Sequence, residues 1–171
     1  MIDLHGELVR LRTTTAADSP RLVEIRETDE VRRRFRSDDV AAEIAADLAD
    51  DELHQLSIEA DGQIVGLIQF YEESDEDYRH ASIDLYIDPA AHRRGFASAA
   101  LQMLTDYLFD EVGHHRITID PAADNAAAIA CYEGIGFKTV GVMRAYERQN
   151  DGSWGDGLLM DLLASERKGK Q

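Results

Sequence analysis

The chain has 171 residues, of which 44% are hydrophobic and 30% are charged. This is enough apolar material for the core of one globular domain, and it excludes wholesale disorder. The 34 acidic and 18 basic residues give a formal net charge of −16, which repels nucleic-acid phosphate and anionic membranes, so we expect neither as a partner. Solubility, adaptation to salt and attraction of a cationic substrate would each account for this charge.

A single cysteine, Cys131, excludes an internal disulfide framework and a thiolate zinc cluster. No run approaches the roughly 18 apolar residues that a membrane span needs. The first residues also lack the basic and apolar regions of a secretory signal. We therefore expect a cytoplasmic protein.

Hydrophobic periodicity and turn residues predict alternating strands and helices, with no linker or internal repeat between them. The expected elements are a strand over 8–12, a helix beginning near Thr15 or Asp18, a helix over 38–51, a hairpin of 54–60 and 63–71 around Asp61-Gly62, a strand over 81–88, a helix over 97–109, a strand over 115–120, a helix over 124–135, and a hairpin of 137–146 and 157–163 around Asn150-Asp151-Gly152. We interpret Arg32-Arg33-Arg34 as a solvated helix face. The acidic residues of 72–77 form either a solvated loop, which we favour, or a loop that lines the acceptor side of the site. This order predicts an α/β fold with a mixed sheet and helices on both faces.

The first motif with chemical content is Asp88-Pro89-Ala90-Ala91-His92-Arg93-Arg94-Gly95-Phe96-Ala97, between a strand and a long helix. Glycine lets the backbone turn tightly, and the start of a helix offers unsatisfied N–H donors with a partial positive charge. Two arginines add mobile positive charge. The motif predicts a phosphate site, unless it is only a helix start with arginines at its rim.

The second motif runs from Asp120 to Phe137 and covers a predicted helix. Asn125 stands near the helix start, and Tyr132 follows two turns later on nearly the same face. Gly136 is a helix stop, and Phe137 begins the next strand. Taken alone, Tyr132 could also be a half-buried packing residue.

Together the two motifs resemble the GCN5-related N-acetyltransferase (GNAT) superfamily. His92-Arg93-Arg94-Gly95-Phe96-Ala97 is similar to its coenzyme loop, Gln/Arg-x-x-Gly-x-Gly/Ala, and only His92 departs from the pattern. The stretch from Asn125 to Phe137 matches Asn-x-x-Ala-x-x-x-Tyr-x-x-x-Gly-Phe in full. A closer resemblance, to the aminoglycoside 6′-N-acetyltransferase branch, is carried by Gly66-Leu67-Ile68-Gln69, Ile83-Asp84, and Asp120-Pro121 with 128–133. That branch grades into ribosomal-protein and polyamine acetyltransferases.

The resemblance implies a single GNAT domain over residues 1–171, with a mostly antiparallel central sheet of about seven strands. Residues 165–171 are expected to form a disordered tail. The resemblance also implies acetyl-CoA as the acetyl donor, no metal ion, and direct attack of a primary amine on the thioester. The residues expected to bind the coenzyme are Leu85, Tyr86 and Ile87 through their backbone, His92, Arg93, Arg94, Gly95, Phe96, Ala97 and Ser98 in the loop, and Asn125, which would contact the pantetheine or orient its helix.

The expected catalytic residues are Asp84, Tyr132 and Asp120. Asp84 lies in mid-strand, where a carboxylate is costly unless it is hydrogen-bonded, paired or facing a cleft, so it is the leading base. If that strand is half-exposed, Asp84 only points at solvent. Asp120 ends a strand and would hold a substrate ammonium or share the base role, or it is a turn former. Tyr132 takes the family's general-acid position, and Cys131 is interpreted as a small core residue.

Three functions stay open at this point. The first is acetylation of a small cationic amine, aminoglycoside-like in character. The second is acetylation of a protein N-terminus or a polyamine. The third is an acyl-CoA-binding regulatory module without turnover, although such a module would need neither Asp84 nor Tyr132. The oligomeric state stays open, because a homodimer is common in the family but nothing in the sequence marks an interface.

Overall fold

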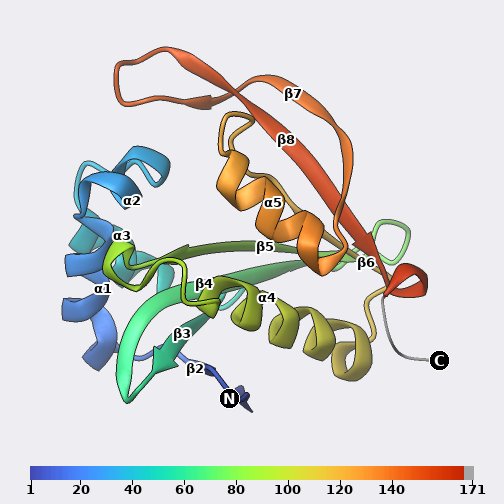
Figure 1. Cartoon of the computed structure of the whole chain (residues 1–171), viewed down its shortest axis with the longest axis horizontal. Helices are drawn as coiled ribbons and strands as arrows, with labels where there is room; N and C mark the ends of the chain where they lie inside the picture. Colours follow the sequence, from blue (N-terminus) through green and yellow to red (C-terminus); the bar gives the residue numbers. More distant parts are fainter. Residues whose placement is uncertain (168–171) are drawn as a thin grey trace. The chain divides into compact units, whose positions relative to one another are not determined.

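The computed structural model describes residues 1–167, which form two compact units (Figure 1). The first unit comprises Met1–Tyr71 and Asp84–Met103, and the second comprises Glu72–Ile83 and the chain from Leu104 onward. The boundary falls inside β4 (Gln63–Glu73), β5 (His80–Ile87) and α4 (Phe96–Tyr107), so each of these elements contributes to both units.

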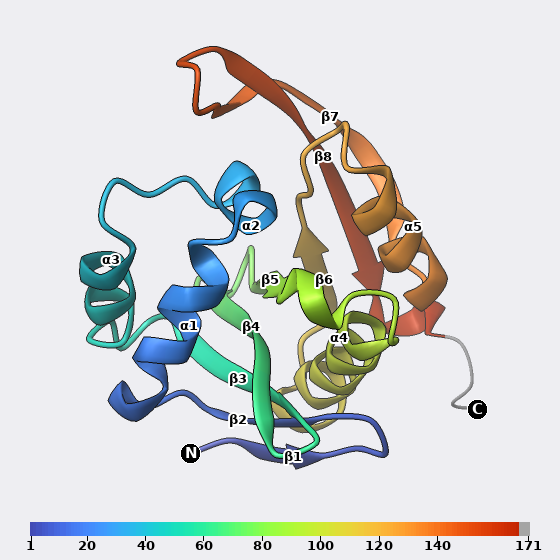
Figure 2. The same ribbon diagram turned by 60° about the vertical axis from the view of Figure 1, so that its left-hand side comes forward.

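The first unit contains strands β1 to β4 and three short helices. Its further elements are β1 (Asp3–His5), β2 (Arg10–Thr13), α1 (Ser19–Arg26), α2 (Asp29–Arg34), α3 (Val40–Asp47) and β3 (His54–Ala60). The strand order is β1-β2-β3-β4-β5, and β1 to β4 lie side by side in antiparallel register (Figure 2). The predicted Asp61-Gly62 hairpin is confirmed, and both residues have the positive φ of a type I′ turn.

Helices α1 to α3 bury one apolar cluster together with β4 and β5. It consists of Leu22, Ile25, Val31, Val40, Ile44, Leu67 and Tyr86. Leu22, Ile25 and Arg26 fall at i, i+3 and i+4, so the buried stripe of α1 also carries an arginine. This cluster fixes the second half of β5, where Asp84 and Tyr86 lie.

The second unit contains the first half of β5, then β6 (Arg116–Ile119), α5 (Ala126–Ile135), β7 (Lys138–Arg148) and β8 (Trp154–Leu163). Its strand order is β5-β6-β8-β7, with β5 and β6 parallel and the other pairs antiparallel. Strands β7 and β8 form the long hairpin drawn in orange to red in Figure 1. Helix α4 ends in a π-helical turn, Leu108–Val112, which Gly113 closes in the left-handed conformation.

The α/β class and the mixed, mostly antiparallel pairing are confirmed. Residues 1–167 contain eight strands rather than about seven, because Asp3–His5 pairs with β2. The helix expected over 38–51 is shorter, since Asp39 caps it by accepting a hydrogen bond from the Ala42 N–H at 3.0 Å and it ends at Asp47. None of the helices in the described residues is long and apolar enough to cross a membrane.

The expected C-terminal tail, 165–171, is described only up to Arg167, and residues 168–171 lie outside the described part of the chain. Ala164–Glu166 form a 3₁₀ turn. The Arg167 guanidinium pairs with Asp106 and, at 2.5 Å, with Asp110. The described part of this segment is therefore attached to the end of helix α4.

Candidate active site

Strand β5 places the side chains of two candidate residues on one face of the sheet. Side chains alternate along a strand, so Asp84 and Tyr86 share a face, and Tyr86 packs into the apolar cluster of the first unit. In the second unit the register of β5 with β6 consists of Ala81–Ile117 and Ser82–Thr118. Both pairs precede Asp84 along the strand.

One edge of the β5 backbone faces strand β4. The Asp88 N–H donates to the Val65 carbonyl at 2.7 Å, and a Cβ built on Gly66 would meet the Tyr86 carbonyl oxygen at 2.3 Å. Because backbone groups alternate between edges with period two, Leu85 and Ile87 face away from β4. The backbone of Tyr86 faces β4, so the structure differs from the expectation that it pairs with the coenzyme. The backbone groups of Leu85 and Ile87 face the opposite edge of the strand.

Two of these outward backbone groups already have partners. The Asp84 carboxylate is half-buried and accepts a hydrogen bond from the Leu85 N–H at 2.9 Å. The Ile87 carbonyl lies 3.1 Å from Nε2 of His92. A carboxylate in mid-strand is costly to desolvate unless it is hydrogen-bonded, so the Leu85 contact offsets part of the cost of placing Asp84 there.

Tyr86 is held by Arg26, a residue that sequence reasoning did not single out as functional. The Arg26 guanidinium carbon lies 5.6 Å from the Tyr86 ring and 5.4 Å from the Phe35 ring, and one of its nitrogens donates to Glu43 at 2.8 Å. Burial raises the pKa of Tyr86 above its ordinary value, against a smaller opposing effect of Arg26, so the phenol stays protonated at neutral pH. The available signal was the position of Arg26 on the apolar stripe of α1.

The segment between β5 and α4 is the predicted coenzyme loop, and it lies in the first unit. Asp88 begins it: its carboxylate accepts from the Ala90 N–H at 2.9 Å and pairs with Arg21. Arg93 and Gly95 then adopt left-handed φ values of 59° and 81°. These reversals bring the chain into α4, whose first helical hydrogen bond joins the Ala99 N–H to the Gly95 carbonyl at 3.0 Å. The N–H groups of Phe96 and Ala97 precede that bond, as an anion site at a helix start requires.

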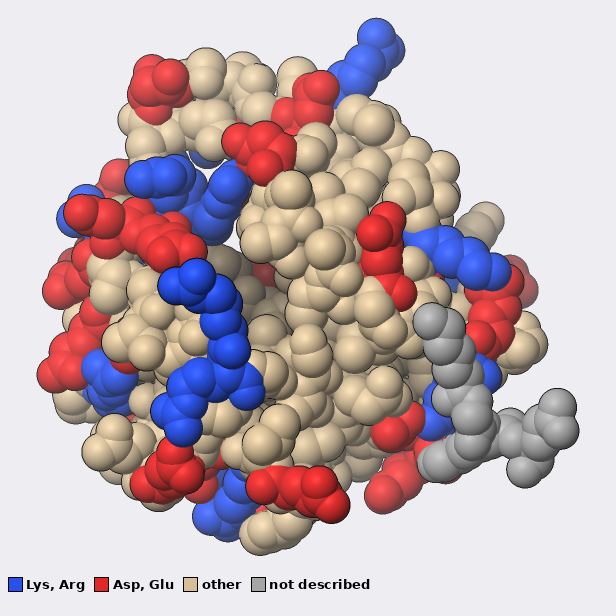
Figure 3. Space-filling view, viewed as in Figure 1, with Lys and Arg blue, Asp and Glu red and all other residues tan. Residues whose placement is uncertain are grey.

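The two arginines of the loop differ in their contacts. Arg94 pairs with Asp61 of the β3–β4 turn at 2.9 Å and stacks 4.6 Å from the centre of the Phe96 ring. Arg93 is exposed. On the face shown in Figure 3, acidic and basic side chains are interspersed, so the negative charge is not gathered into a single patch there.

The second motif lies in the second unit. Asn125 caps α5, since its side-chain oxygen accepts from the Ala128 N–H at 3.3 Å; this is the helix-orienting role weighed above. The Tyr132 carbonyl accepts from the N–H groups of Gly136 and Phe137 at 3.1 and 3.0 Å, which closes the helix. Tyr132 is 8% exposed and its ring centre lies 6.3 Å from that of Phe137. The motif thus fixes a nearly buried tyrosine by its own backbone.

Asp120 and Cys131, two further residues considered from the sequence, also lie in the second unit. Asp120 is exposed directly after β6, and the next carbonyl, that of Pro121, accepts from the Leu158 N–H of β8 at 2.8 Å. Cys131 is half-buried in α5. Within residues 1–167 no group of three or more His, Cys, Asp or Glu side chains is placed to hold a metal ion.

Comparison with known proteins gives three informative likenesses. The ribosomal protein bS18 alanine N-acetyltransferase of Escherichia coli K12 is 35% identical over 82 residues, 48% of this chain and 54% of that protein. The spermidine N(1)-acetyltransferase of the same organism is 28% identical over 101 residues, 56% of this chain and 54% of that protein. The chain therefore spans about half the length of the curated relatives it matches.

Among solved structures, the spermidine N-acetyltransferase from Vibrio cholerae in complex with CoA and spermine superposes with a TM-score of 0.80. It is 22% identical and covers 94% of this chain and 98% of its own, so it shows a shared fold. The model of the acetyltransferase (GNAT) family matches residues 19–137. Because this match covers well over half of the chain, the chain belongs to the acetyltransferase (GNAT) family.

Proposed function

We propose that this protein transfers the acetyl group of acetyl-CoA to a primary amine of a small cationic substrate. The observation that carries the proposal is the loop from His92 to Ala97, which reverses at Gly95 with a φ of 81° and opens directly into α4. Such a helix start suits a diphosphate, because its N–H groups point at the ligand and the glycine lets the backbone approach.

The donor would be held by backbone and by arginine. The helix start and Arg93 would bind the pyrophosphate. Arg94 would also bind it once its ion pair with Asp61 is broken. The outward backbone groups of Leu85 and the N–H of Ile87 would pair with the pantetheine amides, while the Ile87 carbonyl keeps its contact with His92. The Leu85 N–H would then exchange the Asp84 carboxylate for a pantetheine carbonyl, which releases Asp84 for the acceptor amine.

The acceptor must lose a proton before it attacks. An alkyl amine has a pKa of about 10.4, and holding it neutral near pH 7 costs about 4–5 kcal/mol. Asp84 would take this proton; the nitrogen lone pair forms the C–N bond as the C–S bond breaks. Tyr132 would donate a proton to the departing thiolate, and the second proton, which the nitrogen sheds as the C–N bond forms, would pass to solvent, from which Tyr132 recovers its own. Asp120, exposed at the end of β6, would bind a second ammonium of the acceptor.

A second acceptor class is the N-terminal amine of a basic protein. It is favoured by the E. coli relative whose name gives a ribosomal-protein alanine as its substrate. The spermidine acetyltransferase favours a polyamine, the other acceptor of the second hypothesis. The net charge of −16 suits aminoglycoside-like sugars, polyamines and ribosomal proteins alike. A cytoplasmic location stays a prediction, and the oligomeric state stays open.

The test is release of free thiol from acetyl-CoA in the presence of aminoglycosides, polyamines or basic N-terminal peptides, at low and at high salt. We expect turnover with one amine class, and faster turnover at low salt because the acidic protein attracts its substrate. Tight binding of acetyl-CoA without turnover on any amine would support the regulatory module instead.

A further inference from the structure

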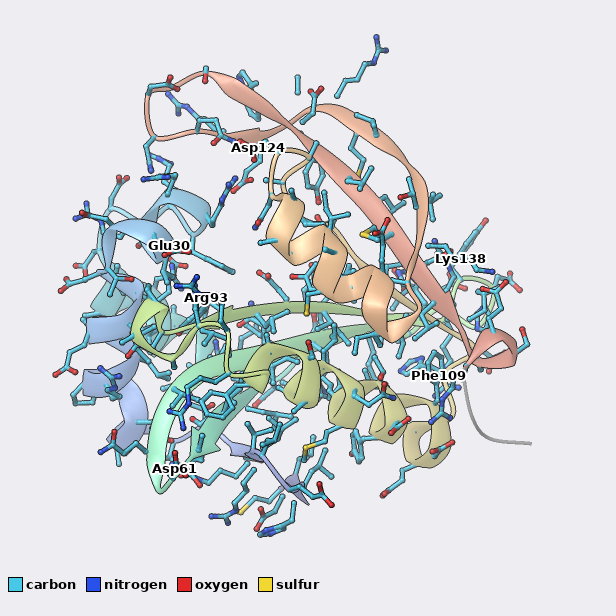
Figure 4. The ribbon with its side chains drawn as sticks, viewed as in Figure 1. Glu30, Asp61, Arg93, Phe109, Asp124 and Lys138 are labelled. Carbon is cyan, nitrogen blue, oxygen red and sulfur yellow. The ribbon has the colours of Figure 1, made fainter. Side chains whose placement is uncertain are left out.

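His92 stands where the family's loop pattern has Gln or Arg, and both of its ring nitrogens have contacts. Nε2 lies 3.1 Å from the Ile87 carbonyl, at the end of β5. Nδ1 lies 3.4 Å from a carboxylate oxygen of Glu30, in the first turn of α2. Figure 4 labels Glu30 and Arg93, the residue that follows His92. The imidazole therefore joins the coenzyme loop to a strand end and to a helix.

The chemistry of these partners distinguishes the protonation states of the ring. A carbonyl oxygen only accepts, so the Ile87 contact requires a proton on Nε2. An ionised carboxylate also only accepts, so the Glu30 contact becomes a hydrogen-bonded ion pair when Nδ1 carries a second proton. The imidazolium satisfies both contacts, whereas the neutral ring directs a lone pair at Glu30.

Two other charged residues of the same loop have partners of their own. Asp88 is occupied by Arg21 and by the Ala90 N–H. Arg94 is paired with Asp61. Arg93 is exposed on the same loop, and a bound pyrophosphate would place negative charge there.

We propose that His92 is a positioning residue whose protonated form ties α2 to the coenzyme loop and makes coenzyme binding proton-linked. The proposal rests on the coenzyme role of the loop given above. Binding of the pyrophosphate favours the imidazolium, the imidazolium strengthens the contact with Glu30, and α2 is thereby held against the loop. Histidine is the side chain whose ordinary titration falls between pH 5 and 8, where this linkage would operate.

The experiment is calorimetric titration of the whole protein with coenzyme A from about pH 5 to about pH 8, in buffers of different ionisation enthalpy. Dephospho-CoA is titrated in parallel, because it lacks the 3′-phosphate that itself ionises near pH 6. We expect both ligands to bind about three- to tenfold more tightly at the acid end, with uptake of a fraction of a proton.

His92→Gln keeps an N–H donor for the Ile87 carbonyl but does not titrate, so its dephospho-CoA affinity should be nearly independent of pH. Glu30→Gln should move the pH profile to lower pH, because the imidazolium loses its carboxylate partner. The matched control is His5→Gln, a histidine of β1 that lies 3.1 Å from Asp3 and outside the loop; its profile should equal that of the wild type.

Two results would overturn the proposal. The first is a His92→Gln protein whose coenzyme affinity changes with pH as that of the wild type does. The second is an affinity loss in that variant that is the same at every pH, because such a loss shows that the His92 ring only fills space in the loop. Failure of the wild type to bind coenzyme A at any pH would instead contradict the proposed function, so the two failures are distinguishable.

Discussion

Replacing Gly66 with alanine should destabilise the first unit and weaken coenzyme binding. Gly66 lies in β4, and a Cβ there would stand 2.3 Å from the Tyr86 carbonyl oxygen and 3.0 Å from the Ile87 Cα. Reaching even 3.0 Å from that oxygen requires a shift of 0.7 Å. The contact is with backbone, and the neighbouring Leu67 and Ile68 are almost fully buried, so neither strand can yield without disturbing the core. We expect a loss of about 2–4 kcal/mol in the free energy of unfolding.

Urea unfolding followed by fluorescence measures this loss, and titration with coenzyme A measures the displacement of the β5 edge. Gly134→Ala is the matched control, because Gly134 lies in α5 and a Cβ there would meet nothing within 4 Å. That variant should gain about 0.5–1 kcal/mol from helix propensity. A Gly66→Ala protein within about 0.5 kcal/mol of the wild type would refute the claim that β4 and β5 approach this closely.

Four further predictions concern the site and acid stability. Asp84→Asn keeps an oxygen for the Leu85 N–H but no base, so kcat should fall about 100-fold or more near neutral pH while coenzyme affinity holds; unchanged turnover would remove Asp84 from that role. Tyr132→Phe should lower kcat more than it raises the KM of the amine, and a KM effect alone would indicate substrate binding instead. Gly95→Val cannot easily adopt a φ of 81°, so coenzyme affinity should be lost in a folded protein; retained affinity would dismiss the loop. The Arg12 guanidinium lowers the pKa of the buried Asp18 carboxyl to about 2, which contributes about 2 kcal/mol of stability that is present above about pH 4 and lost as the pH falls toward 2. Unfolding of Arg12→Met should lack most of this acid-dependent part and keep the share that the Thr15 hydrogen bonds to Asp18 contribute. Equal acid sensitivity in both proteins would contradict the assignment.

The sequence pattern correctly predicted those elements whose structure depends mainly on their own residues. The hairpin around Asp61-Gly62 follows from alternation and a two-residue turn, and both appear in the structure. Strand β1 was missed because Asp3–His5 has little apolar pattern; pairing with β2 and the 2.7 Å contact between Asp3 and Arg10 hold it. Strand β8 begins at Trp154, earlier than predicted, because its register with β7 overrides the weak strand propensity of the glycines that follow.

The same division applies to the candidate site. Motif spacing identified the loop at His92–Ala97 and the helix that carries Tyr132, because each motif is contiguous in the chain. It did not identify Glu43 as the partner of Arg26, or Glu30 as the partner of His92, since these contacts join residues distant in sequence. Nor did it show that Tyr86 turns its backbone to β4, which depends on the approach of Gly66.

The most direct test of the account is a single-turnover reaction with acetyl-CoA and the best amine of the panel, quenched at intervals and followed by mass spectrometry of both amine and protein. Direct transfer predicts that the acetyl group appears on the amine at the rate of thiol release and never on the protein. An acetylated protein that forms first and then decays, with the group on Cys131, would contradict it. So would thiol release without an acetylated amine.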